Sequence, residues 1–457
     1  MRFDPELAEI RFGTGLGPRA ALAPDLGTFL ARLDAPDRAA QTFAIESFLA
    51  QVPDIARFRE LGRAARRGDS AAREERDRIK RDSRHKQVRW FANTGARWID
   101  SRDSFRERLT RFWADHFTVV GKQTMTRAMA ATFVEDAIRP NLTGSFADLL
   151  RASETHPLML DYLDQFKSVG EGSVLAAEGK GLNENLAREI LELHTLGVDG
   201  PYSQDDVRQF ANLLAGFVHD SEGKVDYRPR RGNPGPEVIL GRSYGRDRPR
   251  VEDVWQAFAD LALHPATARH IARKLVVHFV SDDPDEAHVA HVATRFSDTG
   301  GQLMAVYQAL LEHPAAWRPQ RVKIKQPFDF IMSSIRALGV RGAQLSALKL
   351  KDIREGLASP MALMGQSWER PAGPDGWPEA GAYWITPQGL AARIQWAMTI
   401  PLALFERVEG ALPDPRKLSR AALGSHGDAA VEFAASAAET RWEGVGLVLA
   451  SPGFQRR

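Results

Sequence analysis

Apolar residues recur at three- and four-residue intervals along most of the chain. Phe105, Leu109 and Phe112, for example, would share one face of a helix. Ser104 and Glu107 form a capping-box pattern at its start. Comparable apolar runs follow at about 126–139, 145–152, 157–166, 251–263, 265–280, 285–297 and 301–312. This periodicity predicts a mainly α fold, a large multi-helix globular protein.

Only the segment 220–250 departs from the helical pattern. Two short runs, 224–227 and 237–240, flank the turn-rich stretch 231–235, so we expect one small β-hairpin there. We expect a single helical domain, 1–457, built from four successive parts. These are a charged helical arm (35–100), a central helical core with a polar motif (101–219), the hairpin insertion (220–250) and a C-terminal helical part (251–457).

Two further local signals mark helix starts. Ser203 and Asp206 again have the spacing of a capping box. The dipeptide His-Pro occurs three times, each time directly before an apolar-periodic run: at 156–157, 264–265 and 313–314. Proline suits the first helical position, where its missing N–H costs nothing, so we interpret these histidines as structural.

The segment 57–89 carries thirteen basic and six acidic residues, a local charge of +7. Its acids lie three or four residues from its bases, which favours a solvated helical arm with ion pairs along its surface. The alternative interpretation is a surface for an anionic partner.

Composition narrows the classes of function. The 61 basic and 59 acidic residues leave a net charge of +2, so no global field favours nucleic acid as a partner. The absence of cysteine excludes disulfides, thiolate nucleophiles and iron–sulfur clusters. The N-terminus lacks the apolar region of a signal peptide, and no run approaches the ~18 apolar residues of a transmembrane helix. We therefore expect a cytoplasmic protein; the alternative is periplasmic, by co-export with a signal-bearing partner.

The stretch 181–202, GLNENLAREILELHTLGVDGPY, holds the densest set of reactive side chains. On a continuous helix Glu184, Arg188 and Glu192 form one polar stripe, which is typical of an intrahelical ion-pair ladder. His194 would then lie in the last turn before Gly197, where a positive charge suits the helix dipole.

The alternative interpretation of this stretch is functional. Glu189 and Glu192, one turn apart, would bind a divalent metal ion or act as an acid/base pair, with His194 at the helix end. Arg188 and Asn183 would orient the substrate or the carboxylates, beside Glu184. His116 and His278 are the groups most expected to converge on the site from other helices. The candidate metal ligands are therefore Glu189, Glu192, His116 and His278.

A second candidate set lies in ARHIARKLVVHFVSDDP, where His278 and Asp282 are one turn apart and would hydrogen-bond or ligate together. Such a pair more commonly orients a histidine at a helix end. Lys323 and Lys325 would supply positive charge to a site, although nothing in their local sequence separates them from surface lysines.

Six segments carry a resemblance to a known family: GLNENLAREILELHTLGVDGPYSQDDV, FWADHFTV, HPLMLDYLD, LALHPATARHIARKLVVHFVSDDP, KIKQPFDFI and MGQSWERPAGPDGW. Over nearly its whole length the chain resembles the bacterial domain-of-unknown-function family 1800. The resemblance implies a mostly helical fold and, because such proteins tend to be encoded beside sulfatase-like proteins, a sulfatase-like partner. It implies no reaction.

The sequence departs from the family pattern at two places. Ala114-Asp115-His116-Phe117 stands where the family typically has His-Asn-His-Phe, and Gly232-Asn233-Pro234-Gly235 where it often has His-Asp-Pro-Gly. Two family histidines are therefore missing, although Asp115 can still ligate a hard cation. We expect a metal-dependent or acid/base enzyme, hydrolytic or oxidative, with its site on the 183–194 helix. The alternative is a non-catalytic partner or maturation factor of a sulfatase-like protein.

Overall fold

Helices make up 63% of the chain, which confirms the prediction of a mainly α protein. The computed structural model describes residues 3–220, 223–408 and 410–457. Up to the strands the helices are α1 Pro5–Arg11, α2 Leu26–Ala31, α3 Arg38–Thr42, α4 Val52–Arg66, α5 Ser70–Asp100, α6 Ser104–His116, α7 Ala130–Phe133, α8 Phe146–Glu154, α9 Pro157–Tyr162, α10 Asn185–Glu189 and α11 Gln204–Leu214. The π-helical segments Val134–Ile138 and Ile190–Thr195 continue α7 and α10.

After the strands the chain is again helical. These helices are α12 Val251–Ala262, α13 Pro265–Phe279, α14 Glu286–Asp298, α15 Leu303–Glu312, α16 Pro327–Ala337, α17 Gly342–Ala347, α18 Leu350–Ile353, α19 Ser359–Leu363, α20 Gly381–Trp384, α21 Pro387–Arg407, α22 Pro415–Leu423, α23 Ala429–Ala437, α24 Arg441–Ala450 and α25 Pro452–Gln455. Within the three described ranges, no helix is both long enough and apolar enough to cross a membrane.

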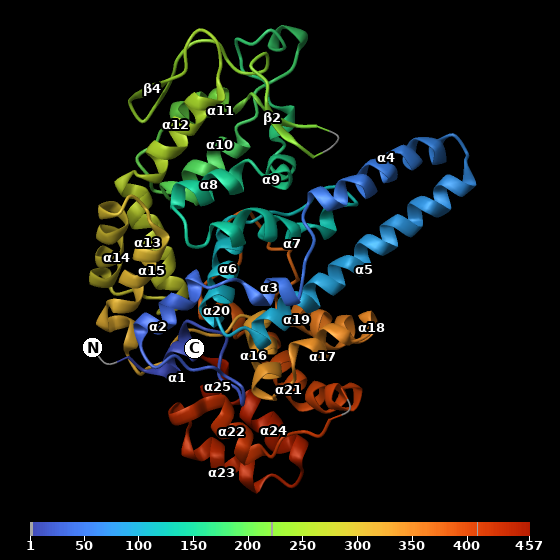
Figure 1. Cartoon of the computed structure of the whole chain (residues 1–457), viewed down its shortest axis with the longest axis vertical. Helices are drawn as coiled ribbons and strands as arrows, with labels where there is room; N and C mark the ends of the chain where they lie inside the picture. Colours follow the sequence, from blue (N-terminus) through green and yellow to red (C-terminus); the bar gives the residue numbers. More distant parts are fainter. Residues whose placement is uncertain (1–2, 221–222, 409) are drawn as a thin grey trace.

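The charged segment forms the two helices α4 and α5, which project from the body as an antiparallel hairpin (Figure 1). Ile55, Phe58 and Ile79 are buried between them. The base of α5 enters the body of the protein, where Trp90 joins one hydrophobic core and Trp98 the other. This long helix therefore connects both cores.

The two hydrophobic cores divide the chain roughly by sequence. The first is built by the helices before α16, and Trp113, Phe105 and Tyr307 are fully buried in it. The second is built by α16 to α25 with the end of α5, around Phe330 and Trp396. Helix α6 and the segment after it lie between the two sets of helices in Figure 1. The candidate site described below lies at this junction.

The segment near 220–250 contains short strands, as expected, but their pairing differs from the prediction. Strand β1, Phe217–His219, pairs with β2, Val225–Tyr227, and β3, Glu237–Ile239, pairs with β4, Arg242–Tyr244. The expected pairing of 224–227 with 237–240 is therefore wrong. Leu240 and Gly241 both have positive φ, 50° and 75°, the backbone of a tight two-residue hairpin turn, so β3 turns back at once into β4.

The structure confirms most of the predicted helix starts. Ser203 and Asp206 form the expected capping box at the start of α11. The rings of His156, His264 and His313 each accept a backbone N–H two residues on, at 3.1, 3.1 and 3.3 Å, which confirms their role at helix starts. Helix α6 begins at Ser104 as expected, but its cap is the preceding Asp103.

Candidate functional site

The predicted helix over 183–194 forms with a change of geometry halfway. Helix α10 ends at Glu189, and the π-helical segment Ile190–Thr195 follows, in which the Thr195 hydroxyl donates to the carbonyl of Ile190 at 2.6 Å. Asn183 lies just before the helix and accepts the backbone N–H of Asn185 at 2.9 Å. Its amide also contacts the carbonyls of residues 163 and 164 at 3.3 Å, so Asn183 joins the helix start to the preceding loop.

The polar stripe forms the ion-pair ladder that its spacing predicts. Arg188 contacts Glu184 at 3.0 Å and Glu192 at 3.3 Å. These three side chains are 36, 32 and 27% exposed, so water screens the ladder and it contributes little to stability, about 0.3–0.5 kcal/mol per pair. Three of the candidate catalytic residues therefore have a structural partner on their own helix.

His194 is buried inside the protein and does not face a cavity. Its Nδ1 lies 2.7 Å from Oε1 of Glu154, and both side chains are at most 1% exposed. Nε2 of His116 lies 3.2 Å from the carbonyl oxygen of His194, and Nε2 of His270 lies 3.0 Å from that of Leu193. Burial, with Lys274 and the neighbouring histidines, lowers the pKa of His116 well below its ordinary value. The histidines thus hold the π-helical segment against α6 and α13.

Glu189 is the exception in the central stretch. Among the described residues it has no hydrogen-bond or ion-pair partner, and it is partly exposed. Burial raises its pKa, and Glu192 and Glu154 act in the same direction. The negative charges of Glu189 and Asp375 both raise the pKa of Tyr162, so this helix lies near the loop 369–380.

Replacing Glu189 by glutamine is expected to leave the thermal midpoint at pH 8 unchanged or raise it, by less than about 1 kcal/mol in stability. The reason is that a carboxylate without a cationic partner is removed. A thermal melt of E189Q beside E192Q measures this, and E192Q should lose a little stability with its arginine contact. A loss of several kcal/mol in E189Q would instead indicate a buried network that needs the charge.

The four proposed metal ligands do not form a cluster. Across the described ranges, no group of three or more His, Asp or Glu side chains is placed to hold a metal ion. Glu192 contacts Arg188, His116 contacts a carbonyl, and Nδ1 of His278 lies 2.5 Å from Glu379. The geometry gives the metal hypothesis no support.

His278 and Asp282 belong to one network, although they do not pair directly. Lys323, 1% exposed, contacts Asp282 at 2.5 Å and Glu379 at 3.0 Å, and Glu379 contacts His278. His278, Lys323 and Asp282 thereby anchor the loop 369–380 to α13. Lys325 is buried as well, and burial lowers its pKa to about 7. Neither lysine is a surface residue.

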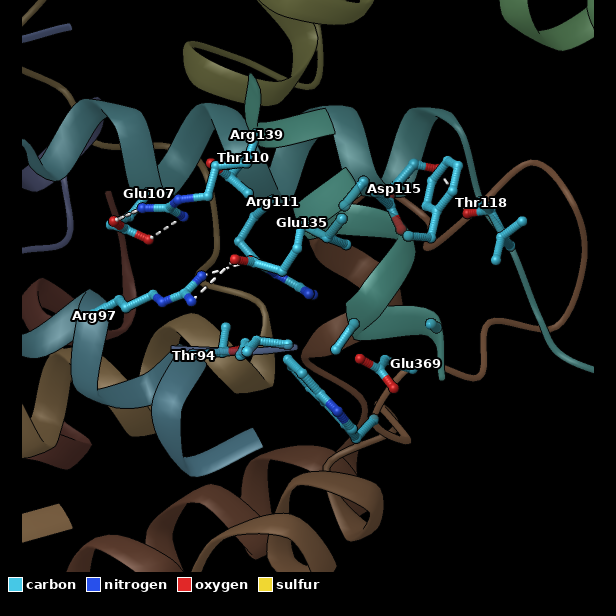
Figure 2. A pocket seen from close by; sticks show the side chains of 18 of the residues that line it. Thr94, Arg97, Glu107, Thr110, Arg111, Asp115, Thr118, Glu135, Arg139 and Glu369 are labelled. Atoms are coloured by element: carbon cyan, nitrogen blue, oxygen red, sulfur yellow. Dashed lines mark hydrogen bonds and ion pairs between the residues drawn. The ribbon is translucent and has the colours of Figure 1, made fainter. Parts of the chain in front are cut away.

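A pocket lies between the two hydrophobic cores (Figure 2). It spans about 780 Å³ when the open solvent at its mouth is counted, and it is lined by α5, α6, residues 130–139 and the loop around Trp368 and Trp377. Two ion pairs form part of its wall: Arg97 with Glu135 at 2.6 Å, and Arg139 with Glu107 at 2.5 Å. These four charges are neutralised by each other.

Three other ionisable side chains in the pocket have no ion-pair partner among the described residues: Arg111, Asp115 and Glu369. Figure 2 shows them around the same space. The Arg111 guanidinium lies over the rings of Phe328 and Trp368, at 4.9 and 5.1 Å from their centroids. Cation–π contacts therefore stabilise its charge, and its N–H groups remain available to a ligand.

Of the four carboxyl groups that line the pocket, the two outside the ion pairs have a pKa that burial raises. Burial and the nearby Glu379 raise the pKa of Asp115 to about 7, although Asp115 accepts the Trp377 backbone N–H at 3.0 and 3.2 Å. Burial likewise raises the pKa of Glu369 to about 7, with Gln87 and Arg111 opposing it. Oε2 of Glu369 is buried without a hydrogen-bond partner. Perturbed carboxyls in a cavity are typical of acid/base sites.

Backbone strain in the loop positions these groups. Glu369 has φ +53°, which is uncommon for a residue with a side chain and is found where the surroundings impose it. Gly376 has φ +82°, and a Cβ there would lie 2.6 Å from the carbonyl oxygen of Asp115. The glycine thus allows the loop to approach α6 closely enough for Trp377 to bind Asp115.

The sequence places the candidate site on the 183–194 helix, whereas Arg111, Asp115 and Glu369 line a pocket built by other segments. The segments FWADHFTV and MGQSWERPAGPDGW were already quoted for the family resemblance, and they meet in this pocket through Asp115 and Trp377. The sequence indicates that Asp115 can ligate a hard cation, whereas no local pattern in it marks Arg111 or Glu369. Lys274 lies between the pocket and the buried histidines, because its positive charge acts to lower the pKa of Asp115, His116 and His270.

Comparison with known proteins gives a single finding. The family described as "Protein of unknown function (DUF1800)" matches residues 9–456. No curated protein and no solved structure matches the chain. Because the match covers nearly the whole sequence, it confirms the resemblance, and the chain belongs to the DUF1800 family of proteins of unknown function.

Proposed function

We propose that this protein is an acid/base enzyme that acts on a small organic anion in the pocket of Arg111, Asp115 and Glu369. One observation carries the proposal: every other charged wall residue of the pocket is ion-paired, whereas these three form no ion pair within the described part of the chain. Burying an ionisable group without a partner lowers the stability of the fold. Such groups in a cavity are therefore typical of functional sites. The proposal keeps the acid/base expectation and moves it from Glu189 and Glu192 to Asp115 and Glu369.

Each residue has a role in this proposal. Arg111, stacked on two aromatic rings, would bind a carboxylate or similar group through its planar fork of N–H donors. Asp115 and Glu369, with pKa values of about 7, would share the work of accepting and returning a proton near neutral pH. The apolar wall, including Trp98 and Phe133, would exclude water from the bound molecule.

Binding through Arg111 is testable without knowledge of the reaction. Wild-type protein and R111Q are melted in the presence of a panel of aliphatic and aromatic mono- and dicarboxylates. A compound that raises the wild-type midpoint should bind R111Q at least about 30-fold more weakly, because its charge loses a partly desolvated partner. The control is R208Q, a surface arginine paired with Glu171. Equal affinity for wild type and R111Q would rule out this pocket as the binding site.

The second candidate is the non-catalytic partner or maturation factor of a sulfatase-like protein. It is supported by the central stretch, where the ladder on Arg188 and the buried contact of His194 with Glu154 are structural. Such buried polar contacts specify packing without chemistry. Co-purification with the product of a neighbouring gene tests this candidate directly. In that case the carboxylate panel would give no ligand for the pocket.

A further inference from the structure

A second, open groove lies at the base of the projecting arm. It spans about 1100 Å³, open solvent included, between α4, α5 and residues 122–127. Six basic side chains line it and no acidic one does: Arg59, Arg63, Arg66, Arg76, Lys122 and Arg127. We propose that this groove binds a short acidic segment of a partner protein. The proposal is independent of the acid/base pocket.

The arginines of the groove are free to bind an external anion. None of the five forms an ion pair with a described carboxylate; Lys122 alone has one, with Asp164 at 2.7 Å. Arg76 lies over the ring of Phe58, 4.4 Å from its centroid, and its buried Nε has no acceptor. Arg59, Arg63 and Arg127 are exposed. A set of unpaired arginines in a concave surface repels itself, and a bound carboxylate would relieve this.

Two acidic residues of the arm form ion pairs outside the groove. Glu60 and Glu75 both contact Arg57, at 2.9 and 2.8 Å, and Arg57 does not line the groove. The charge of +7 over 57–89 is therefore unevenly distributed. The ion pairs of Arg57 lie outside the groove, whereas four other arginines of the arm line the side that faces residues 122–127.

Three observations favour an acidic protein segment over nucleic acid. The net charge of the chain is only +2, so no broad positive field extends beyond the groove. Glu74, Asp77 and Asp82 are exposed further along the same arm, where they would repel a long phosphate backbone. The one aromatic residue of the groove, Phe58, is 8% exposed and covered by Arg76, which leaves no face for stacking a base.

Fluorescence anisotropy with a fluorescein-labelled decaglutamate peptide tests the proposal on the full-length chain. The double variant R63E/R66E should bind the peptide at least about tenfold more weakly than wild type. The matched control is R81E/R84E, which makes the same charge change at two exposed arginines of the same arm outside the groove. It should stay within about twofold of wild type. R127Q, on a separate segment, should weaken binding in the same direction as R63E/R66E.

Three results would overturn the proposal. If both double variants weaken binding equally, the peptide responds to overall charge and the groove is not a site. If a single-stranded oligonucleotide of equal charge binds more tightly than the peptide, with the same dependence on Arg63 and Arg66, the partner is a nucleic acid. If decaglutamate does not bind wild-type protein even at low salt, the groove has no affinity for carboxylates. Thermal melts of each variant confirm that the fold is retained.

Discussion

D115N and E369Q are each expected to lower kcat/KM by about 10²- to 10⁴-fold, the usual contribution of one general acid or base. The substrate for this measurement is a monoester or monoamide of a dicarboxylate that Arg111 is found to bind, so that the free carboxylate keeps its contact with the arginine. Because burial raises the pKa of both carboxyls despite the opposing charge of Arg111, replacing either by its amide should not weaken folding. Loss of activity together with an unchanged or raised thermal midpoint is the signature of a functional site.

The pH dependence of this first prediction follows from the direction of the pKa shifts. The pKa of Glu369 is raised by burial from 4.5 to about 7 in the folded protein. Stability is therefore highest below the unfolded value of about 4.5 and is lost as pH rises through 7. E369Q avoids this loss, so at pH 8 it should be more stable than wild type, on the order of 1 kcal/mol with solvent screening allowed for. Below pH 4 the difference should vanish.

Glu171 provides the control for this pH effect. It is 42% exposed, and its contact with Arg208 lowers its pKa, so E171Q should lose a little stability above pH 5.

Activity should follow a bell-shaped pH profile whose two limbs belong to Asp115 and Glu369 as a pair. Wild-type activity in D115N would show that Asp115 takes no part in the reaction. A profile that is flat between pH 5 and 9 would remove the acid/base proposal.

Replacing Asp329 by alanine is expected to destabilise the protein by about 3–5 kcal/mol. Asp329 is 4% exposed and contacts Arg108 at 2.8 Å and Arg457 at 3.8 Å. Burial alone would raise its pKa, but Arg108, Arg457 and Lys325 together hold it below the ordinary value. The variant would leave these buried cations without their central anion, and uncompensated buried charge is among the most destabilising changes known.

Chemical denaturation measures this second prediction, with D352A as the control. Asp352 contacts Arg407 at 3.0 Å, but the two side chains are 19 and 37% exposed, so D352A should cost less than about 1 kcal/mol. Because the pKa of Asp329 is lowered, its contribution is present above the unfolded value of about 3.9 and is lost as pH falls below it. Equal losses in D329A and D352A would mean that the buried cluster is already neutralised by other means.

Much of the local structure was predictable because it depends on neighbouring residues. Helical spacing, the capping box at Ser203 and the His-Pro helix starts all appear as expected, since each rests on contacts within four residues. The ladder around Arg188 is of the same kind. By contrast, the strand pairing near 220–250 failed, because two tight hairpins and one wide hairpin have nearly the same local pattern.

The candidate site depends on contacts between residues that are far apart in the sequence. Helical periodicity, the spacing of charges and the extended motifs were enough to predict the mainly helical fold, the charged arm and the family. Only the tertiary structure decided that Arg111, Asp115 and Glu369 meet while His194 is buried against Glu154. Arg111 and Glu369 are more than 250 residues apart in sequence, and whether such a charge is paired depends on what folding brings beside it. Burial and missing partners, which set the pKa of both pocket carboxyls near 7, exist only once the two cores have packed together.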